Sequence, residues 1–182
     1  MQKSKGFVSA VMLVVSMAVV ACASTGTTKS AGEQVDDSVT TGRVKAALIA
    51  DPTTKAHQID VETFKGTVQL NGFVDSSASK ERATEVARNT KGVTAVRNNL
   101  TVRTDSRSAG GTVDDSAITA KVKTALAGDS RVAAHQVNVE TRDGVVQLSG
   151  FVDSSEAKST AEELARSVDD VKSVDNEIDV KK

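Results

Sequence analysis

The sequence has 182 residues, of which 26% are charged, and a formal net charge of −1. With four Phe and no Trp or Tyr, it lacks the large rings that usually fill one extensive core, so the composition favours small domains packed with Val, Leu, Ile and Ala. The balanced charge argues against binding nucleic acid through a strong basic excess, and the scarcity of aromatic rings removes the platforms on which bases stack.

The N-terminal segment, residues 1–21, has the features of a signal peptide. Lys3 and Lys5 precede an apolar run from 7 to 21, which is short for a membrane-spanning helix of roughly 20 apolar residues. The run ends at Cys22, the only cysteine of the chain. Residues 19–22 (VVAC) resemble a bacterial lipobox, whose cysteine is acylated before cleavage. The alternative is an ordinary secretory signal with a cysteine near its cleavage site.

Residues 22–34 are small and polar, which predicts a flexible tether between a lipid anchor and the folded part. One acyl chain anchors a protein only marginally, whereas two or more hold it stably at a bilayer. Ala23, rather than Asp, follows the cysteine. By resemblance to Gram-negative lipoproteins, this implies the periplasmic face of the outer membrane, with the soluble periplasm as the alternative location.

The rest of the chain is a duplication. Residues 35–104 align with 113–182 without a gap, and 35 of the 70 aligned pairs are identical. Residues 105–112 (DSRSAGGT) contain Gly and Ser and no large apolar residue, which is typical of a linker. The sequence therefore predicts a signal peptide, a tether and two small domains joined by a short linker.

Each copy predicts the same elements, described here for the first. VDDS (35–38) supplies typical N-cap residues before apolar residues at helical spacing. Residues 59–63 alternate as a half-buried strand, and Lys65-Gly66 predicts a hairpin turn to a return strand at 68–70.

A second helix is expected after residues 75–77 (DSS), and in the second copy Asp153 and Glu156 have the spacing of a capping box. Residues 96–102 alternate as a last strand. The order α-β-β-α-β indicates an α+β fold with a three-stranded sheet and two helices packed on one face.

The repeated motif GxVxLxGxV (66–74 and 144–152), together with GVTAVRNNL (92–100) and its twin DVKSVDNEI (170–178), resembles the BON domain, named for bacterial osmotically inducible and nodulation proteins. The resemblance covers 140 of 182 residues, with Asp170 at a turn where the first copy has Gly92. A lipobox followed by two such domains resembles the dual-BON outer-membrane lipoproteins, whereas soluble periplasmic members have no lipid. The resemblance implies non-catalytic work in envelope integrity under stress.

The repeated polar residues do not form a catalytic or metal-binding pattern. His57 and His135 are equivalent, but neither copy contains a second His or a Cys, so a structural or solvent-facing role is expected. The acidic pairs at 36–37 and 114–115 and the Ser pairs are explained as helix caps, and the hairpin glycines as turn residues. We therefore expect no enzyme activity, no cofactor and no metal.

Charge distinguishes the two copies. Residues 35–104 hold 10 Lys/Arg and 8 Asp/Glu, whereas residues 113–182 hold 9 and 14. The resemblance to the dual-BON lipoproteins implies lipid binding by the second domain, through its first helix and an exposed aromatic residue. Here that helix carries Lys121 and Lys123 without an aromatic, in an acidic domain. Arg43 and Lys45 of the first copy are at least equally good candidates for lipid binding. The alternative is that these side chains only form the solvated face of a helix.

The leading hypothesis is an outer-membrane lipoprotein that binds anionic phospholipid headgroups, with Arg43 and Lys45 contributing more than Lys121 and Lys123. The alternative is a periplasmic chaperone or scaffold that binds client proteins. Nucleic acid is not an expected partner.

Overall fold

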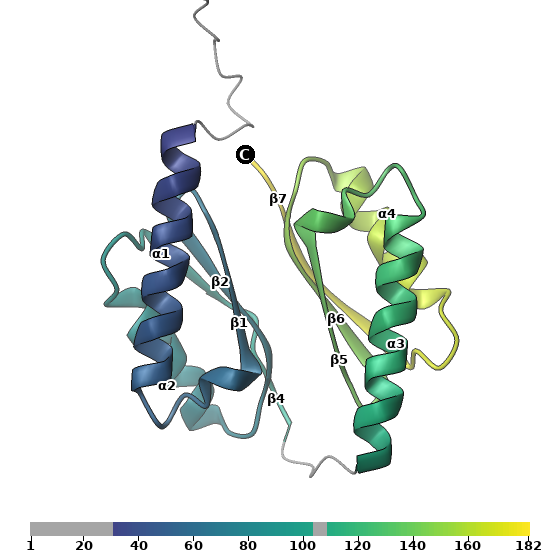
Figure 1. The fold of residues 1–182 in the computed structure, drawn as a ribbon, viewed down its shortest axis with the longest axis horizontal. Coiled ribbons are helices and arrows are strands. Elements are labelled where there is room, and N and C mark those ends of the chain that lie inside the picture. Colours follow the sequence, from purple (N-terminus) through teal and green to yellow (C-terminus); the bar gives the residue numbers. More distant parts are fainter. Residues whose placement is uncertain (1–30, 104–108) are drawn as a thin grey trace, which may run out of the picture.

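The computed structural model describes residues 31–103 and 109–182, which form two domains, named here domain 1 and domain 2 (Figure 1). The expected order α-β-β-α-β is confirmed in each domain, with a short 3-10 helix before the first strand. Domain 1 contains α1 (Ala31–Ala50), β1 (Ile59–Phe64), β2 (Thr67–Val74), α2 (Ser77–Arg88), β3 (Ala95–Asn98) and β4 (Thr101–Val102). Domain 2 contains α3 (Ala109–Ala127), β5 (Val137–Arg142), β6 (Val145–Val152), α4 (Ser155–Arg166) and β7 (Ser173–Val180).

Each sheet has a central strand with one antiparallel and one parallel neighbour. In domain 2, β6 pairs antiparallel with β5 and parallel with β7 over the whole length of β7. In domain 1, the single last strand expected from the sequence is divided into β3 and β4, both parallel to β2. The two pieces occupy successive parts of one edge of the sheet, so the architecture of the two domains is the same.

Two helices cover one face of each sheet and enclose a separate core (Figure 1). The core of domain 1 is built from aliphatic side chains such as Val44, Leu48 and Leu70, all of them buried. The core of domain 2 contains Val122, Leu126 and Leu148 at the equivalent positions. No residue is shared between the two clusters, so each domain carries its own hydrophobic stabilisation.

The hairpin turns are confirmed, but the acidic residues assigned to helix caps have a different role. Lys65 and Gly66 both have positive φ, at 49° and 74°, as a type I′ turn requires. Helix α1 begins at Ala31, so Asp37 lies inside it, and its carboxylate accepts the backbone N–H groups of Lys65 (2.8 Å) and Gly66 (2.9 Å). The N-cap expected at VDDS is therefore wrong, because Asp37 lies inside the helix and connects it to a turn that begins 28 residues later in the chain.

Domain 2 repeats the arrangement. Asp115 lies inside α3, which begins at Ala109, and accepts the N–H groups of Asp143 (2.9 Å) and Gly144 (3.0 Å). Because α1 begins at Ala31 and α3 begins at Ala109, residues 31–34 of the expected tether and residues 109–112 of the expected linker are helical.

The second helix of each domain begins with a serine cap. The Ser76 hydroxyl accepts the Ser79 N–H, and the Ser154 hydroxyl accepts the Ala157 N–H, each at 3.1 Å. The expected capping box from Asp153 is wrong, because Ser154 is the N-cap residue and the Asp153 carboxylate turns instead to Lys181.

The two sheets face each other with their helices on the outside (Figure 1). At the centre, Gln147 accepts the Gly72 N–H (2.6 Å) and Gln69 accepts the Gly150 N–H (3.1 Å). Both glutamines are almost completely buried, although strand alternation places them opposite the helix-covered face. The second face of each sheet is therefore covered by the other domain, and these contacts define the interdomain interface.

Aromatic and ionic contacts surround the glutamines. Phe64 stacks on Phe151 with ring centroids 5.3 Å apart, and Phe73 lies on the same face of β2 as Gln69. Among the described residues, ion pairs that cross between the domains include Arg97–Asp179 at 3.0 Å and Arg142–Asp75 at 3.6 Å. Polar and charged side chains thus make up much of the interface, together with the stacked rings of Phe64 and Phe151.

Candidate functional site

The four cations singled out in the sequence lie on the first helix of each domain, and all four are exposed. Figure 1 shows α1 and α3 on the same side of the molecule, in front of their sheets. In each domain, one of the two cations forms an ion pair with an acidic residue. Lys45 Nζ lies 3.5 Å from Asp60, and Lys121 Nζ lies 3.2 Å from Asp170.

Arg43 and Lys123 differ from their neighbours, because neither forms an ion pair with any residue of the described chain. Each domain therefore offers one unpaired cation on its first helix, a distinction that sequence spacing does not reveal.

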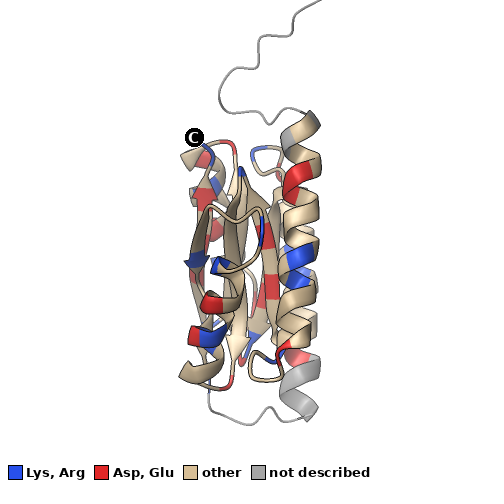
Figure 2. Cartoon of the chain, turned by 90° about the vertical axis from the view of Figure 1, so that its left-hand side faces the viewer, with Lys and Arg blue, Asp and Glu red and all other residues tan. Residues whose placement is uncertain are grey.

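Helix α1 also carries an exposed apolar stripe. Within the described chain, the exposed large hydrophobic side chains are Val35, Val39 and Ile49, with 63%, 43% and 74% of their surface accessible. At about 100° per residue, the three fall within a stripe of about 80° on the helix surface. Arg43 and Lys45 flank this stripe, each about 40° from its nearest apolar member. Figure 2 shows basic residues in the middle of α1 and acidic residues nearer its start.

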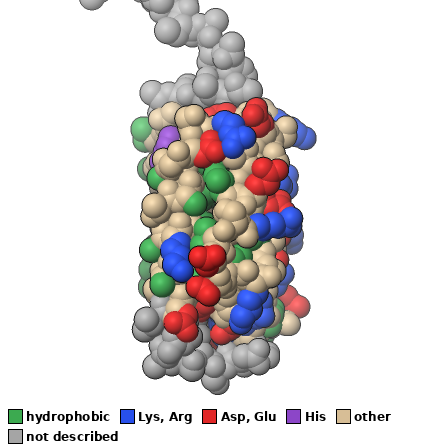
Figure 3. All heavy atoms as spheres, turned by 90° about the vertical axis from the view of Figure 1, so that its right-hand side faces the viewer, with side chains coloured by type: hydrophobic (Ala, Val, Ile, Leu, Met, Phe, Trp, Pro, Cys, Tyr) green, Lys and Arg blue, Asp and Glu red, His purple; other side chains and the backbone are tan. Residues whose placement is uncertain are grey.

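Helix α3 lacks a large side chain at two of the three equivalent positions, whereas Val113 stands at the position of Val35. The positions of Val39 and Ile49 are occupied by Ala117 and Ala127, which are exposed but small. Figure 3 shows acidic and basic side chains interspersed over the outer side of domain 2. Among the side chains that the structure describes, an exposed apolar stripe with flanking cations therefore occurs on α1 and not on α3.

The remaining candidate groups have structural surroundings. His57 and His135 are exposed, and no cluster of three or more potential metal ligands occurs in residues 31–103 and 109–182. Ser76 and Ser154 cap helices, as described above. Cys22 lies outside the described residues. None of the helices that the structure describes has the length and hydrophobicity needed to cross a bilayer.

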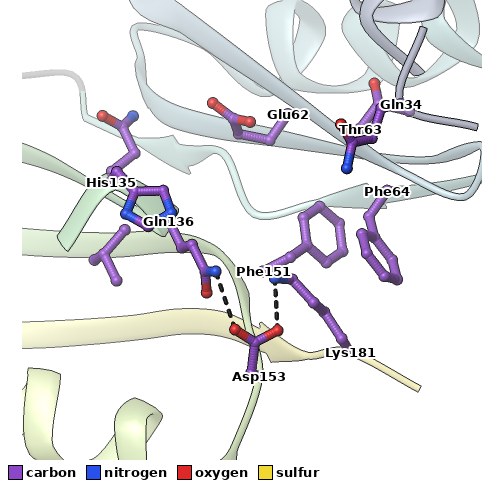
Figure 4. A pocket seen from close by; sticks show the side chains of 11 residues that line it. Gln34, Glu62, Thr63, Phe64, His135, Gln136, Phe151, Asp153 and Lys181 are labelled. Atoms are coloured by element: carbon purple, nitrogen blue, oxygen red, sulfur yellow. Dashed lines mark hydrogen bonds and ion pairs between the residues drawn. The ribbon is translucent and has the colours of Figure 1, made fainter. Parts of the chain in front are cut away.

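A cavity of about 470 Å³ opens at one end of the interdomain interface (Figure 4). The stacked Phe64 and Phe151 form part of its wall, and His135 and Glu62 also line it. The Asp153 carboxylate in this cavity accepts hydrogen bonds from Lys181 (2.8 Å) and Gln136 (3.0 Å).

These partners determine the protonation of Asp153. The hydrogen bond from Lys181, assisted by that from Gln136, lowers the pKa of the carboxyl below its ordinary value of 3.8. The carboxylate is thus held ionised and paired with Lys181 in the wall of the cavity.

Sequence reasoning missed Gln69 and Gln147, which join the domains. Polar residues that alternate with Val and Leu in a strand are ordinarily taken as solvent-facing. The sequence contained one indication of a structural role for them, because Gln and the glycine three residues later are identical in both copies.

Comparison with known proteins identifies the fold family. The BON domain family model matches residues 36–104 and 114–182. The chain is 44% identical to osmotically-inducible protein Y of Escherichia coli, over 82% of this chain and 75% of that protein. It is 36% identical to a 21 kDa hemolysin of Actinobacillus pleuropneumoniae and 34% identical to the outer membrane lipoprotein DolP of Haemophilus influenzae, each over 80% of this chain and 75% of the relative. The chain therefore belongs to the BON-domain family and carries two copies of the domain in tandem.

Proposed function

We propose that this chain is a bacterial envelope protein that acts by binding, and that α1 of domain 1 contacts an anionic phospholipid surface. The observation that carries the proposal is the exposed stripe of Val35, Val39 and Ile49 between Arg43 and Lys45. A helix with an apolar face bordered by cations is suited to lie at the boundary between headgroups and acyl chains.

The charges on α1 favour this contact over the equivalent one on α3. Arg43 is exposed without an ion-pair partner in the described chain, and each Lys or Arg near an anionic membrane contributes about 1 kcal/mol. Lys123 is equally unpaired, but residues 113–182 carry 14 acidic against 9 basic side chains, which opposes approach to an anionic surface. Domain 1 is therefore the proposed membrane contact.

The proposed location is the periplasmic face of the outer membrane, with Cys22 as the acylated anchor. The lipobox-like VVAC at residues 19–22 and the similarity to a relative named an outer membrane lipoprotein support this assignment. The soluble periplasm is the alternative. Cys22→Ser is expected to move the protein from the membrane fraction to the soluble fraction and to leave the signal segment uncleaved by signal peptidase II. An unmodified mature N-terminus at another position would refute the anchor.

Flotation with liposomes tests the membrane contact separately from the anchor, using residues 23–182. Arg43→Gln is expected to weaken binding to vesicles containing anionic lipid about fivefold, the equivalent of ~1 kcal/mol. Lys123→Gln is the matched control in domain 2 and is expected to have a smaller effect. Val39→Ser should weaken binding, whereas Ala117→Ser should not. Binding should also fall as salt is raised.

A second candidate function is that of a chaperone or scaffold for periplasmic client proteins. The same apolar stripe on α1 would bind an exposed hydrophobic segment of a client. Binding that ignores the lipid charge, with Val39→Ser lowering client capture and Arg43→Gln having no effect, would favour this function over membrane binding.

A further inference from the structure

The interdomain interface is built from residues that recur in both domains. Gln69 binds the Gly150 N–H, and Gln147 binds the Gly72 N–H, so each sheet face carries both the acceptor and the donor of the contact. A face that contains both halves of a reciprocal contact is complementary to any other face of the same design, as in two-fold symmetric dimers. The central hydrogen bonds therefore do not require that the two domains belong to one chain.

Ion pairs determine which faces match. Arg97 of domain 1 contacts Asp179 of domain 2 at 3.0 Å. Domain 2 has Asp175 at the position equivalent to Arg97, and domain 1 has Thr101 at the position equivalent to Asp179. Two copies of domain 2 in this arrangement would bring Asp175 against Asp179, which is unfavourable because like charges repel.

Two copies of domain 1 would lose both ion pairs. Arg97 would face Thr101, and Phe64 stands at the position equivalent to Arg142, the partner of Asp75. Only a pairing of domain 1 with domain 2 keeps both ion pairs and avoids opposed carboxylates. Asp175 and Asp179, two of the acidic residues in excess in the second copy, thus favour pairing of domain 2 with domain 1 over pairing with another domain 2.

Separation of the domains leaves both cores intact. The buried clusters of the two domains have no residue in common, and residues 103–108 connect β4 to α3. The faces that would become exposed contain polar and charged side chains, and the Nδ2 of Asn71 is buried without a hydrogen-bond partner in the described chain. Opening therefore returns this amide to water, which lowers the cost of separation.

We propose that the two sheet faces are a reversible pairing surface for a second copy of this chain. Domain 1 of each copy then pairs with domain 2 of the other, through the contacts seen within one chain. A short linker holds the two faces of one chain at an effective concentration on the order of mM, so the closed monomer prevails in dilute solution. The reciprocal dimer forms when pairing within one chain is disfavoured.

A charge-exchange experiment with two variants of the anchor-free chain, residues 23–182, tests the proposal. The first variant carries Asp75→Arg with Arg97→Asp, both in domain 1, and the second carries Arg142→Asp with Asp179→Arg, both in domain 2. Each variant alone places like charges at both ion-pair sites and is expected to be an open monomer. In a reciprocal dimer of the two variants, every site again pairs opposite charges. An equimolar mixture should therefore show twice the monomer mass by light scattering after size-exclusion chromatography.

Two controls keep the test decisive. The chain with all four substitutions restores opposite charges within one molecule, and it is expected to be a closed monomer that does not associate with either variant. Far-UV circular dichroism checks folding, since none of the four side chains belongs to the hydrophobic clusters.

Deleting residues 105–107 from the otherwise unchanged chain should also produce a dimer, because the shortened connection disfavours closure. A monomeric mixture or a monomeric deletion variant with folded domains would overturn the proposal.

Discussion

The contact between Asp37 and the first hairpin turn has a stabilising effect that can be measured. Asp37 is 5% exposed, and its carboxylate accepts the N–H groups of Lys65 and Gly66. A hydrogen bond to a charged group contributes about 1.5–3 kcal/mol, and the freed N–H groups of Asp37→Ala regain part of this from water. We therefore expect the free energy of unfolding of domain 1 to fall by about 3 kcal/mol. For a domain of this size, the melting temperature should fall by at least ~12 °C.

Thermal unfolding and native-state hydrogen exchange measure this effect. The amides of Lys65 and Gly66 should lose at least about tenfold in protection, because their acceptor is removed. Asp36→Ala is the matched control, since this exposed neighbour lies on the same helix and should change stability by less than about 0.5 kcal/mol. Equal melting temperatures for the two variants, or protection lost in the first turn of α1 and kept in the hairpin, would refute the reasoning.

Three further changes have defined outcomes. Gly150→Ala should destabilise domain 2 by about 2 kcal/mol or more in urea unfolding, because a Cβ would lie 2.1 Å from the Gln136 carbonyl oxygen at a φ of 120°. Ser154→Ala should cost about 1 kcal/mol through loss of the α4 cap, measured in the same way. Lys181→Met should raise the pKa of Asp153 toward 3.8 in an NMR titration. Since the folded-state pKa is the lower one, the stabilisation from this pair is present above pH 3.8 and is lost as the pH falls through the folded value.

The element order and the hairpins were predictable because their causes are local. Alternating Val and Thr, and Gly at a position of positive φ, act within a few residues of each other. The role of Asp37 was not predictable in this way. An aspartate before an apolar helical pattern has the same local signature whether it caps its own helix or binds a distant turn, and only the fold brings the turn at Lys65 beside it.

The candidate site was predictable in residue type and only partly in arrangement. The sequence placed Arg43 and Lys45 on one helix, but the pairing of Lys45 with Asp60 depends on the position of α1 over β1. The exposure of Val39 and Ile49 was equally hidden, because apolar residues on a helix are ordinarily assigned to its buried face. The burial of Gln69 depends on a second domain, which strand periodicity does not describe.

The scarcity of aromatic residues makes the protein almost non-fluorescent, so a single introduced Trp would report on its own surroundings. The chain has no Trp or Tyr, so its ultraviolet emission is very weak. Phe151 borders the cavity at the end of the interdomain interface, where the larger ring of a Phe151→Trp variant has room. A single indole at this position would emit against almost no background, and its spectrum would shift to the red as water reaches it. The same scarcity of rings that limits the cores therefore makes the separation of the two domains directly observable in solution.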